Sequence, residues 1–182
     1  MRTVAVVGAS LAGLSAARSL RQRGYDGRLV MIGDEPHRPY DRPPLSKEFL
    51  AGTVGEADLA LERDDEELGA EWLLGARATG LDRRTRTIGL ADGREVRADG
   101  VVVATGASAR TLPGTDGLAG VHALRTLDDA RALRADLARG GRLVVIGGGF
   151  VGAEVASTAY ALGLDDTEVE AASSAQGAPL RP

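Results

Sequence analysis

The sequence predicts an α/β fold, in which a parallel sheet carries an inserted antiparallel β-meander and is followed by a second, incomplete parallel unit. Two observations predict the parallel units. Near residues 3–23 and 143–162, an apolar run is followed by a glycine-rich turn and a helical segment. Strands that are apolar throughout need burial on both faces, which favours a parallel sheet covered by helices. A third observation predicts the meander, because residues 71–97 hold short, half-polar runs separated by turn residues.

The first parallel unit begins with the apolar run Thr3–Val7, which predicts a strand. Residues 11–23 follow with the periodicity of a helix that places Leu11, Leu14, Ala17 and Leu20 on one face. Gly24 fits the position after the helix C-terminus. Residues 29–32 form a second apolar run, so the segment predicts a βαβ unit.

A rigid, charged loop interrupts this pattern at residues 38–47, which read RPYDRPPLSK. The two consecutive prolines exclude a helix interior and a central strand. We expect a short helix at 45–50, and then an acidic loop and a solvated helix across 56–69.

The inserted meander is predicted from four short runs at 71–74, 77–81, 85–90 and 95–97. Asp92-Gly93 is a strong hairpin signal within it. Residues 101–104 then return to the apolar composition of a buried parallel strand.

The second unit is introduced by an amphipathic helix at 127–139, with Thr126 or Asp128 as its N-cap. A strand at 143–146, a glycine turn, a helix at 150–162 and a weak strand ending at Glu170 repeat the opening pattern. Residues 171–182 are small and polar, which predicts a disordered tail. The predicted domains are 1–125 and the beginning of a second one at 126–170.

Composition excludes several functions. A net charge of -4 offers no basic field, so we expect no nucleic-acid partner. The chain has no cysteine, which excludes disulfides, zinc–thiolate and iron–sulfur ligation and a redox dithiol, and we expect no metal site. Redox chemistry would therefore belong to a bound organic cofactor.

Targeting and membrane segments are not expected either. Glycines and arginines interrupt the N-terminal apolar run, which argues against a signal peptide. Residues 143–164 approach the length of a transmembrane helix, but three glycines at 147–149 divide them into a strand and a helix. We expect a soluble, cytoplasmic protein without membrane insertion.

Both parallel units contain a glycine turn of the type that binds dinucleotides. The first runs Gly8-Ala9-Ser10-Leu11-Ala12-Gly13, and the second, from Gly147 through Gly149, Phe150 and Val151 to Gly152, matches G-x-G-x-x-G in full. In such turns the glycines permit the turn, the approach of the pyrophosphate and close helix packing, while the helix N-terminus attracts phosphate. Ser10 occupies the close-approach position, where its hydroxyl could bond a phosphate. The alternative is that the glycines serve packing alone.

An acidic residue follows each turn at the distance a ribose-binding carboxylate requires, about twenty residues further on. Asp34 and Glu35 follow the first turn, and Glu170 follows the second. Such a carboxylate would bond a ribose diol and repel a 2′-phosphate. Two units of this kind predict two dinucleotides.

These motifs together resemble one family. Five segments are similar to the ferredoxin and rubredoxin reductase group of FAD-dependent pyridine nucleotide-disulfide oxidoreductases. They are the stretch 4–13, IGDEPHRPYDRPPLSKEFLAG, VVVATGA, LRTLDDA and VVIGGGFVGAEVASTAYALG. The resemblance implies a Rossmann-like FAD-binding domain at 1–125, completed by a later return segment, and the start of an NAD(P)-binding domain. It also implies electron transfer from NAD(P)H through FAD to a ferredoxin- or rubredoxin-like protein. Of the two nicotinamide cofactors, Glu170 favours NADH.

The resemblance further implies roles for individual residues. Arg42 would reach the FAD pyrophosphate, and Lys47 the flavin ring, where it would pair with Glu154 beside the nicotinamide. The other residues implied to contact FAD are Asp34, Glu35, Ala78, Ala104, Thr105, Gly106 and Arg125. For Arg125 and the loop, an ordinary solvated role is the alternative. For Glu154 the alternative is a first-turn carboxylate favoured by the helix dipole, and for Thr105 and Gly106 it is strand termination.

The chain departs from the family in length, since family members are roughly twice as long. The segment ending at Glu170 also carries Asp166 and Glu168 where a buried strand needs apolar residues, so we expect it to be weakly docked. Three hypotheses follow: an N-terminal portion of a flavin-dependent NADH oxidoreductase, a non-catalytic nucleotide-binding fragment, and an interaction domain that binds no nucleotide.

Overall fold

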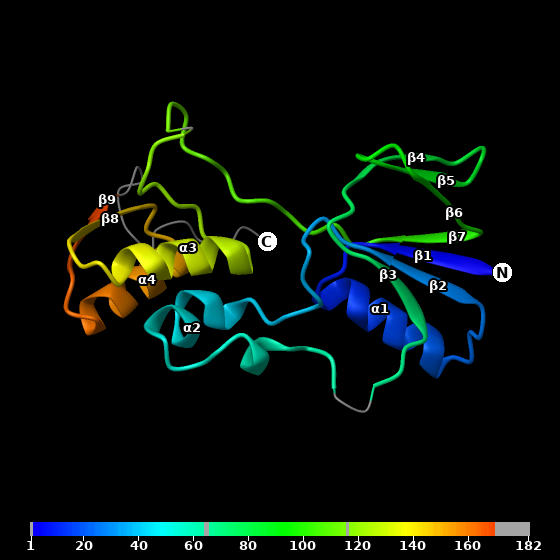
Figure 1. Ribbon diagram of the computed structural model, residues 1–182, viewed down its shortest axis with the longest axis horizontal. Coiled ribbons are helices and arrows are strands. Elements are labelled where there is room, and N and C mark those ends of the chain that lie inside the picture. The colour runs from blue at the N-terminus through cyan, green and yellow to red at the C-terminus, as the bar shows by residue number, and fades with distance from the viewer. Residues whose placement is uncertain (1, 64–65, 116, 170–182) are drawn as a thin grey trace, which may run out of the picture. The chain divides into compact units, whose positions relative to one another are not determined.

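A computed structural model describes residues 2–63, 66–115 and 117–169 of the chain. These residues pack as two compact units (Figure 1). Unit 1 contains the described residues up to Asp41 together with Ala60–Ala107, and unit 2 contains Arg42–Leu59 and the described residues from Ser108 onward. This division by packing differs from the predicted boundary at 125/126, which concerns where cofactors bind and stays a prediction. The predicted tail and Glu170 lie outside the described residues.

Unit 1 is built on a four-stranded parallel sheet in the order β3-β2-β1-β7. Its strands are β1 (Thr3–Val7), β2 (Arg28–Ile32), β3 (Ala70–Leu73) and β7 (Gly100–Val103), and α1 (Leu11–Gln22) connects the first two. β1 pairs with β2 on one side and with β7 on the other. The predicted α/β class and βαβ unit are confirmed.

Each face of this sheet is covered by a different element. Val4 and Val6 pack with Leu14 and Ala17 of α1, so the helix covers one face. The alternate residues, among them Ala5, pack against the antiparallel strands on the other face, where Ile88, Leu90 and Val96 are buried. Figure 1 shows α1 and the antiparallel strands on opposite sides of β1. Burial on both faces explains why β1 and β2 are apolar after their first residues.

The inserted meander consists of β4 (Ala78–Asp82), β5 (Thr87–Leu90) and β6 (Glu95–Arg97), paired antiparallel in that order. The predicted hairpin at Asp92-Gly93 joins β5 and β6, with Gly93 at φ +86°. The assignment of residues 71–74 to the meander is wrong, because β3 pairs in parallel with β2 at the edge of the main sheet.

The proline-rich segment forms short helical pieces instead of an irregular loop. The 3-10 helix η1 spans Pro43–Ser46, with both prolines in its first turn, and α2 spans Glu48–Ala51. A proline fits a first helical turn because the amide proton that it lacks has no partner there. The solvated helix predicted within 56–69 is wrong for the described residues, which contain only the 3-10 turn η2 (Ala57–Leu59).

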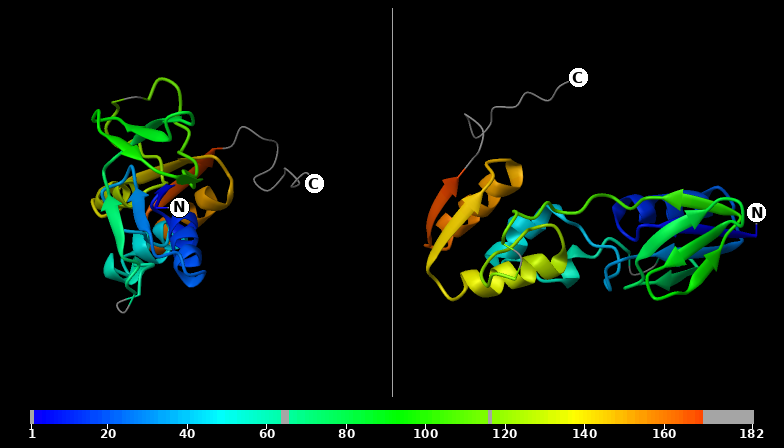
Figure 2. Two further views of the ribbon diagram at one scale, coloured as in Figure 1. Left: turned by 90° about the vertical axis from the view of Figure 1, so that its right-hand side faces the viewer. Right: turned by 90° about the horizontal axis from the view of Figure 1, so that it is seen from above.

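Unit 2 contains α3 (Leu127–Leu137), β8 (Arg142–Ile146), α4 (Phe150–Ala161) and β9 (Asp165–Val169) in addition to η1, α2 and η2. Figure 2 shows β8 and β9 side by side, and the two strands pair in parallel. Leu50, Leu133, Val145 and Val155 form the buried core between α2, α3, β8 and α4. The predicted strand–turn–helix is therefore confirmed, and no helix among the described residues is long and apolar enough to cross a membrane.

Thr126 begins α3 with a reciprocal cap, which decides between the two predicted N-caps. Its hydroxyl accepts a hydrogen bond from the Asp129 amide at 3.1 Å, and the Asp129 carboxylate accepts one from the Thr126 amide at 2.8 Å. This capping box satisfies two backbone donors at the helix N-terminus.

Candidate functional site

The first glycine turn requires its glycines for steric reasons. Gly8 has φ +117°, and a Cβ at this position would lie 1.9 Å from the carbonyl oxygen of Ala104, just after β7. A Cβ on Gly13 would lie 1.8 Å from the carbonyl oxygen of Gly8. The turn is thus pressed between β7 and the first turn of α1, and no side chain fits at either position. The predicted residues Gly8, Gly13 and Ala104 are therefore brought together in unit 1.

The N-terminus of α1 is suited to bind an anion. Ser10 is the N-cap, its backbone is extended and its hydroxyl makes no capping hydrogen bond to the helix. The next residue, Leu11, is 54% exposed although it was predicted to lie on the buried face, and Ala12 is exposed as well. Amide protons in a first turn that no side chain caps are the donors that bind phosphate groups in dinucleotide sites. A turn without space for side chains, next to an uncapped helix, fits a pyrophosphate group.

The second glycine turn repeats this geometry in unit 2. Gly147 has φ +113°, and a Cβ on Gly152 would lie 2.0 Å from the carbonyl oxygen of Gly147. Gly149 is the N-cap of α4, has an extended backbone and cannot cap the helix with a side chain. Phe150 and Val151 begin the helix and are 87% and 49% exposed. The second turn therefore also fits a phosphate group.

The acids predicted to bind ribose follow β2, and each has a partner. The Asp34 carboxylate lies 3.5 Å from the Arg77 guanidinium, and both side chains are exposed. The hydroxyl of Tyr40 donates a hydrogen bond to Glu35 at 2.5 Å. Ala78, the predicted adenine contact, is the first residue of β4 and follows Arg77 directly. Thr105 and Gly106 are exposed and follow β7.

In unit 2, the proline-rich segment and α4 are joined by an ion pair. The Lys47 ammonium lies 2.9 Å from Oε1 of Glu154, and the side chains are 42% and 31% exposed. Lys47 also donates to the carbonyl oxygen of Pro43 at 3.0 Å. The predicted pairing of Lys47 with Glu154 is confirmed. The chain has 22 cationic residues, and Lys47 is the one lysine among them.

Glu154 makes a second polar contact that sequence reasoning missed. The hydroxyl of Ser46, which is 4% exposed, donates to Oε2 of Glu154 at 2.5 Å. Hydrogen bonds from Ser46 and then from Lys47 lower the pKa of Glu154 below its usual value, against the opposing effect of burial. Glu154 is therefore a carboxylate at neutral pH, with donors on both oxygens.

A hollow of about 560 Å³ opens beside this ion pair, within unit 2. Its lining comes from α2 and from one face of α4 and includes Lys47, Phe150, Ala153, Glu154 and Ser157. The exposed ring of Phe150 and the ion pair thus border the same space. Such a concave surface, with apolar side chains and a few polar ones, is suited to a planar organic group.

Arg42 and Arg125 also lie together in unit 2. A guanidinium nitrogen of Arg42 donates to the carbonyl oxygen of Arg125 at 2.7 Å, and the Arg125 amide donates to Asp129 at 3.0 Å. Arg42 is the N-cap residue of η1, so it begins the segment that carries Lys47. Among the described residues, no group of three histidine, cysteine or acidic side chains is placed to hold a metal ion.

Comparison with known proteins identifies the family of the chain. The model of the pyridine nucleotide-disulphide oxidoreductase family matches residues 2–180. The chain belongs to this family. The Rossmann-like fold inferred from the sequence is confirmed, and solved reductases share it.

Several ferredoxin reductases are similar to this family member. The ferredoxin–NAD(+) reductase subunit of the benzene 1,2-dioxygenase system of Pseudomonas putida is 44% identical over 171 residues, which are 92% of this chain and 42% of the relative. Putidaredoxin reductase of Pseudomonas putida is 38% identical over 175 residues, 93% of this chain and 42% of the relative. The chain thus spans less than half the length of these relatives.

Solved structures show the same similarity. The covalent putidaredoxin reductase–putidaredoxin complex matches with a TM-score of 0.85 and 38% identity, over 92% of this chain and 42% of that one. A ferredoxin reductase from Rhodopseudomonas palustris matches with a TM-score of 0.87 and 39% identity, over 95% of this chain and 43% of that one.

Four residues near the predicted sites were not singled out from the sequence: Tyr40, Ser46, Arg77 and Thr158. Thr158 offered a signal, since it lies four positions after Glu154 and therefore on the same face of α4. Ser46 offered only its position before Lys47. Tyr40 contacts Glu35 and Arg77 contacts Asp34, and no local sequence pattern indicates either contact.

Proposed function

We propose that the chain is an N-terminal portion of an FAD-dependent oxidoreductase that transfers electrons from NADH through flavin to a small iron–sulfur protein. The observation that carries this proposal is the Lys47–Glu154 ion pair, which joins the proline-rich segment to the helix of the second glycine turn. A domain that only binds a nucleotide does not require a charged pair at this place. Such a pair is understandable where a flavin and a nicotinamide have to meet.

FAD binding would use the first glycine turn and the residues around it. The first turn of α1, at Ser10, Leu11 and Ala12, would hold the pyrophosphate, with Gly8 and Gly13 permitting its approach. The further residues of this proposed site are Asp34, Glu35, Arg42, Lys47, Ala78, Ala104, Thr105, Gly106 and Arg125. The acids would accept hydrogen bonds from ribose, and Arg42 would add a positive charge for the phosphates.

NADH binding would use the second turn, at Gly147, Gly149, Phe150, Val151 and Gly152. NADH is favoured over NADPH because Glu170, in the next ribose-binding position of the sequence, would repel a 2′-phosphate. Glu170 lies outside the described residues, so this preference rests on sequence spacing.

FAD, when bound, supplies the chemistry by accepting two electrons as hydride from NADH and releasing them to a one-electron carrier. Lys47 and Glu154 would act as catalytic residues that orient the reacting ring and balance its charge. Their ion pair holds the two side chains next to each other before the ring binds, which reduces the entropic cost of positioning. The prolines at 43 and 44 restrain the backbone that carries Lys47.

The proposed electron acceptor is a ferredoxin- or rubredoxin-like protein. The support is similarity alone: relatives are named as ferredoxin–NAD(+) reductase components of dioxygenase systems, and one similar structure is a reductase bound to putidaredoxin.

A second candidate function is nucleotide binding without turnover. The observation that favours it is length, because the chain spans 42% of the similar reductases. This candidate retains the phosphate-binding turns but needs no role for Lys47 and Glu154.

The effect of Lys47→Ala on NADH oxidation with a dye acceptor tests the choice between these candidates. We expect the purified chain, supplied with FAD, to oxidise NADH and the variant to lose at least about tenfold in rate, a loss of about 1.4 kcal/mol in barrier lowering. Arg139→Ala is the matched control, because it removes a 77% exposed cation from the C-terminal end of α3. Equal rates in wild type and Lys47→Ala would refute the assigned role, and no turnover in either would favour the binding fragment.

A further inference from the structure

Ser46 lies between two polar side chains of α4 and contacts both. Its hydroxyl donates to Glu154 at 2.5 Å, and its carbonyl oxygen accepts a hydrogen bond from the Thr158 hydroxyl at 2.9 Å. Ser46 is 4% exposed and Thr158 is 9% exposed, and they are the buried polar residues of the described chain. A buried hydroxyl group is normally retained only with a hydrogen-bond partner; the Ser46 hydroxyl has Glu154 as its acceptor, and the Thr158 hydroxyl has the Ser46 carbonyl oxygen.

The spacing on α4 explains why one residue can bridge both partners. Glu154 and Thr158 are one helical turn apart and point to the same side of the helix. Ser46 ends η1 where that segment contacts α4, so its backbone faces Thr158 while its side chain faces Glu154. The Thr158 bond fixes the Ser46 backbone, and the fixed backbone in turn directs the Ser46 hydroxyl.

The two oxygens of Glu154 are divided between two donors. Oε1 lies 2.9 Å from the Lys47 ammonium, and Oε2 accepts a hydrogen bond from the Ser46 hydroxyl. A carboxylate held at both oxygens has a fixed plane, whereas the ion pair alone would let it rotate. With its side chain 31% exposed, Glu154 would otherwise exchange Lys47 for water readily.

We propose that Ser46 and Thr158 are positioning residues, which hold Glu154 ionised and oriented toward Lys47. This inference rests on the proposed function for its catalytic meaning, since the pair they position is the one assigned to the nicotinamide and flavin. Ser46 acts directly on the carboxylate, and Thr158 acts through the Ser46 backbone. Neither is required to touch the cofactor.

The electrostatic surroundings of Glu154 agree with this assignment. The Ser46 hydrogen bond is the largest of the effects that lower the pKa of Glu154, ahead of the bonds and charge of Lys47. The charged groups that line the adjoining hollow are Lys47 and Glu48 from the proline-rich segment and α2. Because a hydrogen-bond donor favours the charged form of a carboxyl group, removing Ser46 should raise the pKa of Glu154.

The single lysine makes a direct test possible in the chain without cofactor. Incorporation of ¹³C,¹⁵N-lysine labels Lys47 alone, and its Cε and Nζ NMR signals should shift as the paired Glu154 titrates. A plot of these signals against pH should therefore show an inflection at the pKa of Glu154. Glu154→Gln should abolish the inflection, which would show that it reports Glu154. In Ser46→Ala the inflection should move to higher pH, and in Thr158→Val it should move in the same direction by less. Thr158→Ser, which keeps the hydroxyl, should restore the wild-type value.

Ser157→Ala is the matched control, because it removes an exposed hydroxyl from the adjacent position of α4 and lines the same hollow. Its inflection should coincide with that of wild type. An unchanged inflection in Ser46→Ala and Thr158→Val, with folding verified by circular dichroism, would overturn the inference. The NMR titration uses the chain without cofactor, so it is independent of the turnover assay. If the inflection moves in Ser46→Ala but the chain does not oxidise NADH, the positioning role is retained and the proposed function is rejected.

Discussion

Single residues fix the first glycine turn, and Gly13 shows how. A Cβ at Gly13 would lie 1.8 Å from the Gly8 carbonyl oxygen, although φ at this position is not unusual. Helix propensity alone would favour alanine here by about 1 kcal/mol. The close approach of α1 to the turn therefore outweighs propensity, because backbone has to move to admit even one methyl group.

Gly13→Ala should destabilise unit 1 by about 1–3 kcal/mol, the range for overpacking a close contact. Trp72, the chain's only tryptophan, lies on β3 in unit 1, so its fluorescence in a urea titration reports this loss. Gly80→Ala is the control, since a Cβ on Gly80 in β4 meets no atom within 4 Å. Gly80→Ala should be neutral or stabilising, and a Gly13→Ala midpoint at or above wild type would contradict the steric account.

At the residue scale, site residues that belong to a motif could be predicted from the sequence, whereas those that depend on tertiary contacts could not. The glycines of both turns were predicted from strand–turn–helix context, and the pairing of Lys47 with Glu154 from family resemblance. Ser46 was not predicted, because a serine in a loop can bond many groups and only the fold brings it to α4. Periodicity placed Leu11 on the same face as Leu14 and Ala17, but Leu11 is the first residue of the helix and is exposed.

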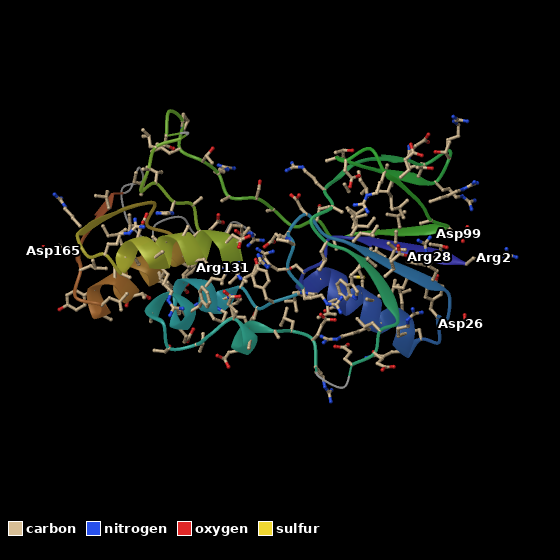
Figure 3. All side chains as sticks on the ribbon, in the orientation of Figure 1. Arg2, Asp26, Arg28, Asp99, Arg131 and Asp165 are labelled. Carbon is tan, nitrogen blue, oxygen red and sulfur yellow. The ribbon has the colours of Figure 1, made fainter. Side chains whose placement is uncertain are left out.

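At the scale of elements, the wrong assignment of β3 arose because this strand has one neighbouring strand instead of two. β3 is the edge of the parallel sheet, so Glu71 is exposed and pairs with Arg28 at 2.7 Å. This half-polar pattern is the one typical of an antiparallel strand, which explains the wrong assignment. Figure 3 shows Arg28 at the beginning of β2.

The acidic segment at 56–69 was interpreted as a loop followed by a solvated helix, but three of its acids pair with distant arginines. Within unit 1, Glu66 pairs with Arg18 and Glu62 with Arg38; within unit 2, Glu56 pairs with Arg131, which Figure 3 labels on α3. A local pattern cannot distinguish a solvated acid from one that tethers a loop to a helix.

The Arg18–Glu66 pair should make the stability of unit 1 depend on pH. Arg18 donates to both Glu66 oxygens, at 2.6 and 2.5 Å, and this bond lowers the pKa of Glu66 below its ordinary value of 4.5. The contribution is therefore complete above pH 4.5 and is lost as pH falls through the lowered, folded-state pKa.

We expect Glu66→Gln to lower the urea midpoint reported by Trp72 at pH 7, with a smaller difference from wild type at pH 3. Glu71→Gln is the control, since Glu71 is 46% exposed and its pair with Arg28 should contribute little at either pH. A difference between wild type and Glu66→Gln that is equal at both pH values would show that the pair contributes no pH-dependent stability.

At the scale of the whole molecule, the chain contains both glycine turns but spans 42% of the length of similar reductases. Unit 2 exposes large apolar residues, including Ile146 at 63%, Phe150 at 87% and Tyr160 at 78%. The sequence predicted that two strand–turn–helix units exist. It could not predict how residues 42–59 pack, because that depends on the core shared by Leu50, Leu133, Val145 and Val155.

The visible absorption spectrum of the purified chain tests the central claim most directly. The chain would be incubated with FAD, desalted, and then mixed with NADH under anaerobic conditions. The account predicts a retained flavin band that bleaches on addition of NADH. If the chain retains no flavin, or retains a flavin band that NADH does not bleach, the result would contradict the proposal that the chain supports electron transfer from NADH to FAD.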